Sequence, residues 1–386
     1  MDNQLSSQDS LRLNVLLASK PQALRIDESR MTVYGLTPQG EAKVTLNPNC
    51  RDEQYLKRVR EMISGHVLGS PGGYPVYLRR WTRMGQARAE SLDQLLLLGE
   101  PEAVVAVVHA AGLTDEQARR AWWALPSAEN ARRMLLREEV LEGSMGTVLA
   151  EFLVEFLPFE EEPVSMIESV RLVLQPGLVD EAVVAGIWKK ARHKTAYLVG
   201  FLMSRPDDLP EPEPPRPDLD AHRPVLEELA GTGNPYAARL LKVLDSPGQT
   251  WLRVAAQVLR KPNNQDVVNL FLDTVADYFM DVRPGLDKDA TLEQIAAEAE
   301  ALLAGRALSD WTPPGELAEI MAGAPGLRPE LRAMLILSRL GYPVVRPVFS
   351  RTDAIGSLMR RKLEPVTAPI LAELAVLQGT AGPRAG

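Results

Sequence analysis

Two stretches in the middle of the chain decide its fold class: Gly112-Leu113-Thr114-Asp115-Glu116, followed by Trp122, and Gly177-Leu178-Val179-Asp180-Glu181, followed by Trp188. In each, a Gly-Leu turn leads into acidic residues, which suit the first turn of a helix because the helix dipole is positive there. The tryptophans are expected to pack between helices. The similarity of the two stretches has two explanations, a repeated helical unit or two helix starts that are similar by chance. One recurrence does not distinguish between them.

The region around these stretches, residues 91–204, has the pattern of short amphipathic or buried helices separated by Gly or Pro. Residues 225–386 return to the same pattern, and Thr291-Leu292-Glu293-Gln294 is typical of a capping box that begins a helix. Tyr342 to Phe349 differs, because its valines and two prolines predict an edge strand or extended loop. Between the two helical regions, residues 205–224 hold seven prolines among acidic residues and predict a semi-rigid, Pro-rich linker.

The N-terminal region, residues 1–90, mixes strand and helix signals. Ile26 to Tyr34 and Ala42 to Leu46 carry β-branched residues with partial alternation, which predicts a hairpin with a loop of several residues. A helix is expected over 51–64, where apolar residues recur on one face. The whole chain therefore predicts a mainly α protein of short stacked helices, similar to a helical repeat, with a small α+β N-terminal part. The expected domains are 1–90, 91–204 and 225–386, joined by the linker at 205–224.

Composition narrows the function classes. The chain has 386 residues, of which 45% are hydrophobic, so it is long enough for several folded domains. Its 43 basic and 51 acidic residues give a net charge of −8, which argues against a protein dedicated to coating nucleic acid. No apolar run approaches the roughly 20 residues that span a bilayer. We therefore expect a cytoplasmic protein without membrane insertion.

Cys50, the only cysteine, stands between Asn49 and Arg51 at the predicted start of the helix at 51–64. A helix N-terminus and a neighbouring arginine both favour the thiolate, which is the nucleophilic form. A thiol in this position could accept a persulfide sulfur or form a mixed disulfide. The alternative is a residue at a helix start without any chemistry, and single cysteines are commonly of that kind.

A glycine-rich turn with an arginine cluster after it is the second candidate site. The turn, Gly69 to Pro75, includes Gly72 and Gly73, whose backbone amides could form an anion-binding nest. Arginine forks suit carboxylate, sulfate or phosphate. The alternative is a rigid turn beside ordinary surface charge. The residues expected to bind an anion or a partner are Arg51, His66, Gly72, Gly73, Arg79, Arg80 and Arg83.

Other chemistry is not indicated. No His, Cys or carboxylate spacing is typical of a metal site, and no phosphate-loop or nucleotide-binding motif is present, so we expect neither metal nor cofactor. Cys50 is the one candidate catalytic residue, and no other catalytic residue is predicted.

Four stretches together carry a resemblance to a known family. The chain resembles the DsrS family, soluble cytoplasmic accessory proteins of the reverse dissimilatory sulfite reductase system of sulfur-oxidising bacteria. The stretches are Asp27-Glu28-Ser29 with Met31-Thr32-Val33-Tyr34-Gly35-Leu36, Leu46-Asn47-Pro48-Asn49-Cys50-Arg51-Asp52-Glu53-Gln54-Tyr55-Leu56, Gly65-His66-Val67-Leu68-Gly69-Ser70-Pro71-Gly72-Gly73-Tyr74-Pro75-Val76-Tyr77-Leu78, and Leu95-Leu96-Leu97-Leu98-Gly99-Glu100-Pro101-Glu102-Ala103-Val104.

The resemblance implies an accessory or interaction function in the oxidation of stored sulfur, with other proteins of that pathway as partners. It implies no catalytic residue, and an enzyme is the less expected outcome. Two alternatives stay open: a persulfide-handling sulfur-transfer protein that uses Cys50, and a nucleic-acid-linked regulator of sulfur-oxidation genes. The second needs a basic surface, whereas the chain as a whole is acidic.

Overall fold

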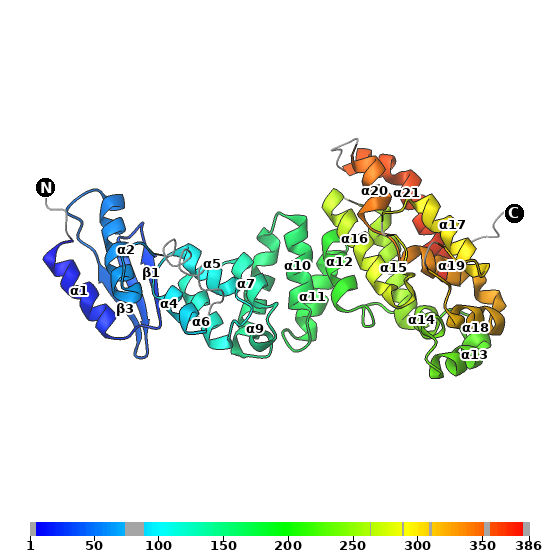
Figure 1. Ribbon diagram of the computed structural model, residues 1–386, viewed down its shortest axis with the longest axis horizontal. Coiled ribbons are helices and arrows are strands. Elements are labelled where there is room, and N and C mark those ends of the chain that lie inside the picture. The colour runs from blue at the N-terminus through cyan, green and yellow to red at the C-terminus, as the bar shows by residue number, and fades with distance from the viewer. Residues whose placement is uncertain are drawn as a thin grey trace. The chain divides into compact units, whose positions relative to one another are not determined.

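The computed structural model describes residues 5–73, 89–262, 264–287, 289–308, 311–350 and 356–380. Across these residues the chain is mainly helical, with a small three-stranded antiparallel sheet near the N-terminus (Figure 1). The predicted fold class, mainly α with a small α+β N-terminal part, is confirmed. The chain divides into two compact units, Met1–Phe156 and Leu157–Gly386.

The first unit begins with the sheet and two helices and continues as a block of short helices. The elements of its first part are α1 (Ser7–Ala18), β1 (Ala23–Asp27), β2 (Thr32–Thr37), β3 (Gly40–Thr45) and α2 (Asp52–Leu68). The helices that follow are α4 (Ala89–Leu96), α5 (Pro101–His109), α6 (Asp115–Ala124), α7 (Ala128–Met134), α8 (Glu138–Leu141) and α9 (Ser144–Phe156).

The sheet corrects the predicted single hairpin, because its order β1-β2-β3 contains two hairpins. The first expected strand is broken by a tight turn, in which the Asp27 carboxylate accepts hydrogen bonds from Ser29 Oγ at 2.7 Å and from Arg30 N at 3.1 Å. A short aspartate side chain that bonds the backbone ahead of it competes with strand continuation in this way. The second loop is also shorter than predicted, since β2 ends at Thr37 and β3 begins at Gly40.

One face of the sheet packs against α1 and α2. Their shared core includes Leu16 of α1, Val33 of β2 and Tyr55 of α2, all buried. Within it, the carboxylate of Asp9 is fully buried and accepts hydrogen bonds from Tyr55 Oη at 2.5 Å and from Asn47 N at 2.7 Å. Burial opposes ionisation, but these hydrogen bonds outweigh it and hold the pKa of Asp9 below its usual value. The ionised aspartate thus ties α1 to α2 and to the loop before α2.

The second unit consists of helices α10 to α21 with short 3-10 turns. Its elements are η1 (Leu157–Phe159), α10 (Pro163–Val173), α11 (Glu181–Ala191), α12 (Thr195–Ser204), α13 (Leu219–Gly231), α14 (Pro235–Leu244), α15 (Ser246–Arg260), α16 (Gln265–Tyr278), η2 (Met280–Val282), α17 (Leu292–Leu303), α18 (Gly315–Gly323), η3 (Pro325–Leu327), α19 (Arg328–Leu337), α20 (Tyr342–Phe349) and α21 (Gly356–Leu377).

The two echoed stretches begin helices whose tryptophans occupy equivalent positions. Thr114 caps α6 and Asp180 caps α11, and each tryptophan follows its N-cap by eight residues. Trp122 contacts Phe152 of α9 edge-on at 4.8 Å, and Trp188 contacts Phe201 of α12 edge-on at 4.9 Å. The prediction that these tryptophans pack between helices is confirmed.

The Pro-rich segment predicted as a linker lies inside the second unit. Its backbone bonds to neighbouring helices, with Glu213 N donating to Thr250 Oγ1 at 2.8 Å and Arg216 N donating to Leu244 O at 2.8 Å. The Arg216 side chain is only 5% exposed. It forms ion pairs with Asp218 at 2.6 Å and with Glu330 of α19 at 2.8 Å, and it donates to the Val376 carbonyl of α21 at 3.3 Å.

Tyr342 to Phe349 was predicted as an edge strand or extended loop, and this prediction is wrong because the segment forms α20. Pro343 occupies the first turn of the helix, where its missing N–H costs no hydrogen bond. Val344, Val345 and Phe349 are buried. Tertiary packing of this apolar face therefore outweighs the strand preference of valine.

No helix in the described parts of the chain is both long enough and apolar enough to span a lipid bilayer.

The position of Arg216 leads to a first prediction. We expect Arg216→Ala to lower the free energy of unfolding of the second unit by about 3 kcal/mol, because it leaves the Glu330 carboxylate buried without its cation. Thermal unfolding and hydrogen exchange of α19 and α21 measure the effect. Arg223→Ala is the matched control, since the Arg223 side chain is 39% exposed. Equal melting of the two variants would contradict the prediction.

Candidate functional site: a cleft between the sheet and the helices of the first unit

A cleft of about 530 Å³ lies where the sheet of the first unit meets its helical block. One side consists of β1 and the turn after it, together with Tyr34 of β2. The other side consists of residues 99–104 at the start of α5 and residues 124–126 at the end of α6. Since β1 and the end of α6 both line the cleft, the position of α6 against the sheet contributes to its width.

Arg25 of β1 makes the direct link between the sheet and α6. Its guanidinium lies 4.8 Å from the ring centre of Tyr34 and 4.9 Å from that of Trp123. It also pairs with Glu41 at 3.3 Å, and the indole Nε1 of Trp123 donates to the same carboxylate at 3.1 Å. Cation–π contacts of this kind contribute about 1 kcal/mol each at partly exposed positions. Arg25 is therefore both a lining residue and a structural link.

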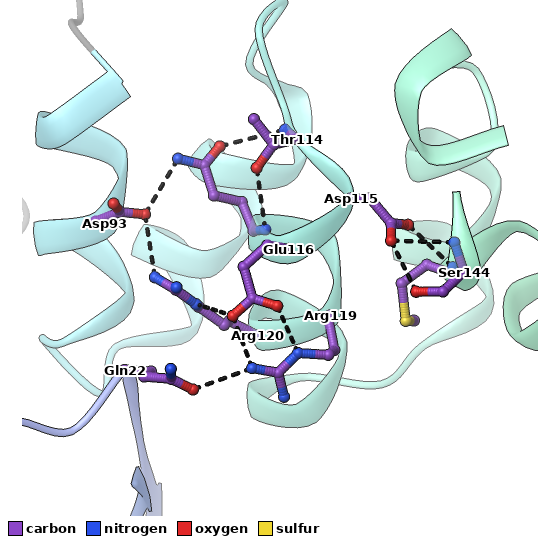
Figure 2. Close-up of polar contacts among 10 residues, drawn as sticks. Gln22, Asp93, Thr114, Asp115, Glu116, Arg119, Arg120 and Ser144 are labelled. Carbon is purple, nitrogen blue, oxygen red and sulfur yellow. Dashed lines mark hydrogen bonds and ion pairs between the residues drawn. The ribbon is translucent and has the colours of Figure 1, made fainter. Parts of the chain in front are cut away.

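A polar network holds α6 to three other elements, as Figure 2 shows. Arg119 of α6 donates to the Gln22 side chain before β1 at 3.0 Å, and Arg120 pairs with Asp93 of α4 at 3.5 Å. Asp115 at the start of α6 accepts hydrogen bonds from Ser144 N at 3.0 Å and from Met145 N at 2.9 Å. The carboxylate of Asp115 therefore meets the positive N-terminal end of α9.

Glu116 lies at the centre of this network. It accepts hydrogen bonds from Arg119 Nε at 2.7 Å and from Arg120 Nε at 2.8 Å (Figure 2). The hydrogen bond from Arg119 is the largest cause that lowers the pKa of Glu116 to about 2, and Arg120 adds to it against the opposing effect of burial. The carboxylate is thus ionised over the whole physiological range, and it aligns both guanidinium groups toward their partners on the sheet and on α4.

A second cleft, of about 550 Å³, adjoins the first and shares Glu100 and Pro101 with it. The sequence-predicted residues Gly72 and Gly73 line this second cleft. Gly73 has φ of 60°, a left-handed value that favours glycine, and a Cβ there would also displace the Glu100 carboxylate. Its N–H donates to Ser64 Oγ at 2.8 Å, and that amide is therefore engaged within the chain.

The charges of the second cleft come mostly from residues that the sequence analysis did not single out. Lys57, Arg60 and Glu61 of α2 line it, with Glu28 and Glu102 opposite. Arg60 forms an ion pair with Glu28. The signal for these residues was present, because they recur on the face of α2 opposite to the buried Tyr55 and Val59.

The other sequence-predicted residues lie elsewhere or outside the described residues. Cys50 is half-buried against the core of the sheet and α1, Arg51 is the exposed N-cap of α2, and His66 is exposed in the last turn of α2. None of these three is among the residues that line either cleft. Arg79, Arg80 and Arg83 lie outside the described residues. The predicted anion site stays a prediction.

The two clefts offer both signs of charge and an aromatic hydroxyl, a combination that suits the surface of a protein partner. Among the described residues, no group of three or more histidine, cysteine or carboxylate side chains could hold a metal ion. Comparisons of the chain with protein families, with curated proteins and with solved structures found no match.

The depressed pKa of Glu116 predicts a pH dependence of stability. A carboxylate with a lowered folded-state pKa contributes stability above its ordinary value of 4.5, and the contribution is lost as pH falls toward about 2. We expect Glu116→Gln to cost about 1 kcal/mol at pH 7, since the carboxylate is 46% exposed and partly screened. The cost should shrink as the pH is lowered below 4.5.

Urea unfolding at several pH values between 7 and about 3 measures this difference. The matched control is Glu139→Gln, an exposed residue of α8 in the same unit. A cost for Glu116→Gln that stays constant with pH, or one that equals the control, would show that the charge of Glu116 does not stabilise the fold.

Proposed function

We propose that the chain is an accessory interaction protein in the cytoplasmic oxidation of stored sulfur. Its first unit binds a protein partner in the cleft between the sheet and α6. The observation that carries this proposal is the cleft itself, about 530 Å³ in volume, whose walls are fixed by the network around Glu116. A preformed surface loses little conformational entropy when a partner binds.

The exposed side chains at the cleft indicate how a partner would be recognised. Arg30 has a side chain that is 75% exposed, and it stands beside Asp27 in the turn between β1 and β2. Charges at the rim of an interface chiefly steer association and select the partner. Tyr34 and Leu125 supply the apolar contacts that such a rim surrounds.

The pathway is supported by the resemblance to the DsrS family. Three of the four stretches that carry it contribute residues to the two clefts. These residues are Asp27 and Tyr34, then Gly72 and Gly73, and then Gly99, Glu100, Pro101, Glu102 and Val104. Several residues that carry the resemblance therefore also line the clefts. This overlap supports an interaction surface that the chain shares with the DsrS family.

Affinity purification from sulfur-oxidising cells tests the proposal. The full tagged chain, cross-linked in cells that are consuming stored sulfur, should enrich components of the sulfur-oxidation pathway. We expect Arg30→Glu to reduce that enrichment about fivefold by reversing a rim charge. Arg306→Glu, which reverses an exposed charge of the second unit, is the matched control and should leave the enrichment unchanged.

Two outcomes would count against this function. The first is that no sulfur-pathway component is enriched, and the second is that Arg30→Glu and Arg306→Glu capture the same amount. Cys50→Ser should retain capture, because Cys50 does not line the cleft. Loss of capture with Cys50→Ser alone would favour the sulfur-transfer alternative.

A further inference from the structure

β1 and β3 are the two edge strands of the N-terminal sheet, and they differ in what lies beside them. β1 faces the helical block of the first unit, where it contacts α4 and α6 and where Gly99 packs against Leu24 and Ile26. β3 forms the other edge, and α1 packs on one of its faces. An edge strand whose backbone groups lack partners can pair with a strand of another chain.

The backbone groups of β3 that face away from the sheet belong to Glu41, Lys43 and Thr45. In an antiparallel pair, the residues that bond to the neighbouring strand alternate along each strand. The N–H of Leu46, just after β3, donates to Met31 O at 2.8 Å, so the even-numbered residues bond to β2 and the odd-numbered residues face outward. In the described parts of the chain, no backbone hydrogen bond reaches these outward groups.

The side chains of β3 alternate between the two faces of the sheet. Ala42 and Val44 pack against the core that α1 and α2 cover. Glu41, Lys43 and Thr45 are exposed on the other face. A carboxylate and an ammonium group therefore lie two residues apart on one open face, each beside its own unpaired backbone groups.

The Glu41 carboxylate is engaged through only one of its oxygens. Arg25 lies 3.3 Å from Oε2, and the indole of Trp123 donates to the same atom at 3.1 Å. No described residue bonds to Oε1, and the side chain is 44% exposed. Because each carboxylate oxygen can accept hydrogen bonds, Oε1 is available to a cation that approaches from beyond the strand edge.

Only one way of pairing β3 with the β3 of a second copy brings these charges together. With the two-fold axis at Ala42, Glu41 of each chain lies opposite Lys43 of the other, and opposite charges in such cross-strand pairs are stabilising. An axis at Lys43 would place two lysines directly opposite each other, which is destabilising. An axis at Val44 would place Lys43 opposite Thr45, so that the lysine meets no carboxylate.

We propose that β3 pairs with β3 of a second copy of this chain around a two-fold axis at Ala42, which joins the two sheets into one antiparallel sheet. Glu41 and Lys43 of each chain exchange backbone hydrogen bonds with Lys43 and Glu41 of the other, and their side chains form ion pairs. The two Ala42 residues face each other, and their small side chains suit the close approach of about 4.5 Å in such a pair. The interface is separate from both clefts of the first unit, because no β3 residue lines them.

Sedimentation velocity of the full chain tests this association. We expect a concentration-dependent shift from monomer to dimer, with half association on the order of 10 μM because the interface is small. Lys43→Glu sets two carboxylates opposite each other, so association should weaken at least about tenfold. Arg133→Glu, the same charge change at an exposed residue of α7, is the matched control and should associate like the unmodified chain. A chain that stays monomeric at about 100 μM, or equal weakening by both variants, overturns the proposal.

A mixture of two variants tests the register of the pairing. Glu41→Lys alone sets two lysines opposite each other and Lys43→Glu alone sets two carboxylates opposite each other, so neither should dimerise. In a mixed dimer every such pair again joins a lysine to a glutamate, and mixing should restore association. Both variants remain acidic, since each changes the net charge of −8 by two units, so attraction between the whole chains cannot produce this result. A mixture of folded variants that stays monomeric would contradict the register.

A disulfide crosslink locates the two-fold axis, and it decides the matter if Glu41→Lys does not fold. In a Cys50→Ser background, which removes the only native cysteine, we expect Ala42→Cys to form a linked dimer on mild oxidation, because the two residues lie about 4.5 Å apart at the axis. Thr45→Cys on the same strand is the matched control, since its two copies lie about 20 Å apart and should crosslink at least about tenfold more slowly. Equal rates at the two positions would place the axis elsewhere and refute the proposal.

The outer face of α1 is the other surface of the first unit that could hold two copies together. Leu11 and Val15 lie one helical turn apart on α1, and their side chains are 66% and 63% exposed. We expect Leu11→Ser to leave the dimer unchanged, because Leu11 is not part of β3. A dimer that is lost with Leu11→Ser and retained with Lys43→Glu would place the contact on α1 and overturn the pairing of β3.

Discussion

The ionised carboxylate of Glu116 is the interaction on which the first unit depends. Its bonds to Arg119 and Arg120 orient both guanidinium groups, one toward Gln22 at the sheet and the other toward Asp93 on α4. Without that charge, each long arginine side chain would have to be ordered by its remaining contact alone, at a considerable cost in rotamer entropy. Glu116 therefore helps to keep α6 in the position that shapes the cleft, together with Arg25 and Asp115.

The second unit contains a comparable arrangement, but in a buried setting. Arg216 joins Asp218 and Glu330 and reaches the backbone of α21, and its side chain is 5% exposed. Buried ion pairs contribute little net stability compared with apolar packing, yet losing one partner is costly. Such a group thus acts mainly to hold its own segment in one place against α19 and α21. The same charge pairing explains why a stretch so rich in proline packs within the unit.

Local chemistry could be predicted from the sequence, and long-range packing could not. The pattern Thr291-Leu292-Glu293-Gln294 predicted a capping box, and the structure confirms it with both reciprocal hydrogen bonds. These bonds connect residues three apart, so the sequence contains all of the information. In contrast, α20 has local signals for extended chain, and only burial of its apolar face against other helices makes it helical.

The candidate sites show the same division. Gly72 and Gly73 could be found because glycine has a recognisable conformational role. Lys57 and Arg60 could be assigned to one face of a helix, but nothing in the sequence places that face beside the glycines. The packing of the segment at 205–224 within the second unit could not be predicted either, because its contacts reach Thr250 and Glu330 much later in the chain. Trp188 was correctly expected to pack between helices, and its ring lies edge-on against Phe201 of α12.

The ion pairs at the cleft of the first unit bear on the kind of binding that this cleft supports. Arg25 is already paired with Glu41, and Arg30 is already paired with Asp27. A partner gains little by replacing such a pair with an equivalent one, because exposed ion pairs contribute at most about 1 kcal/mol. Affinity must then come mainly from apolar contacts, while the paired charges exclude ligands of the wrong pattern. Surfaces of this composition favour selective and reversible binding over tight, permanent association.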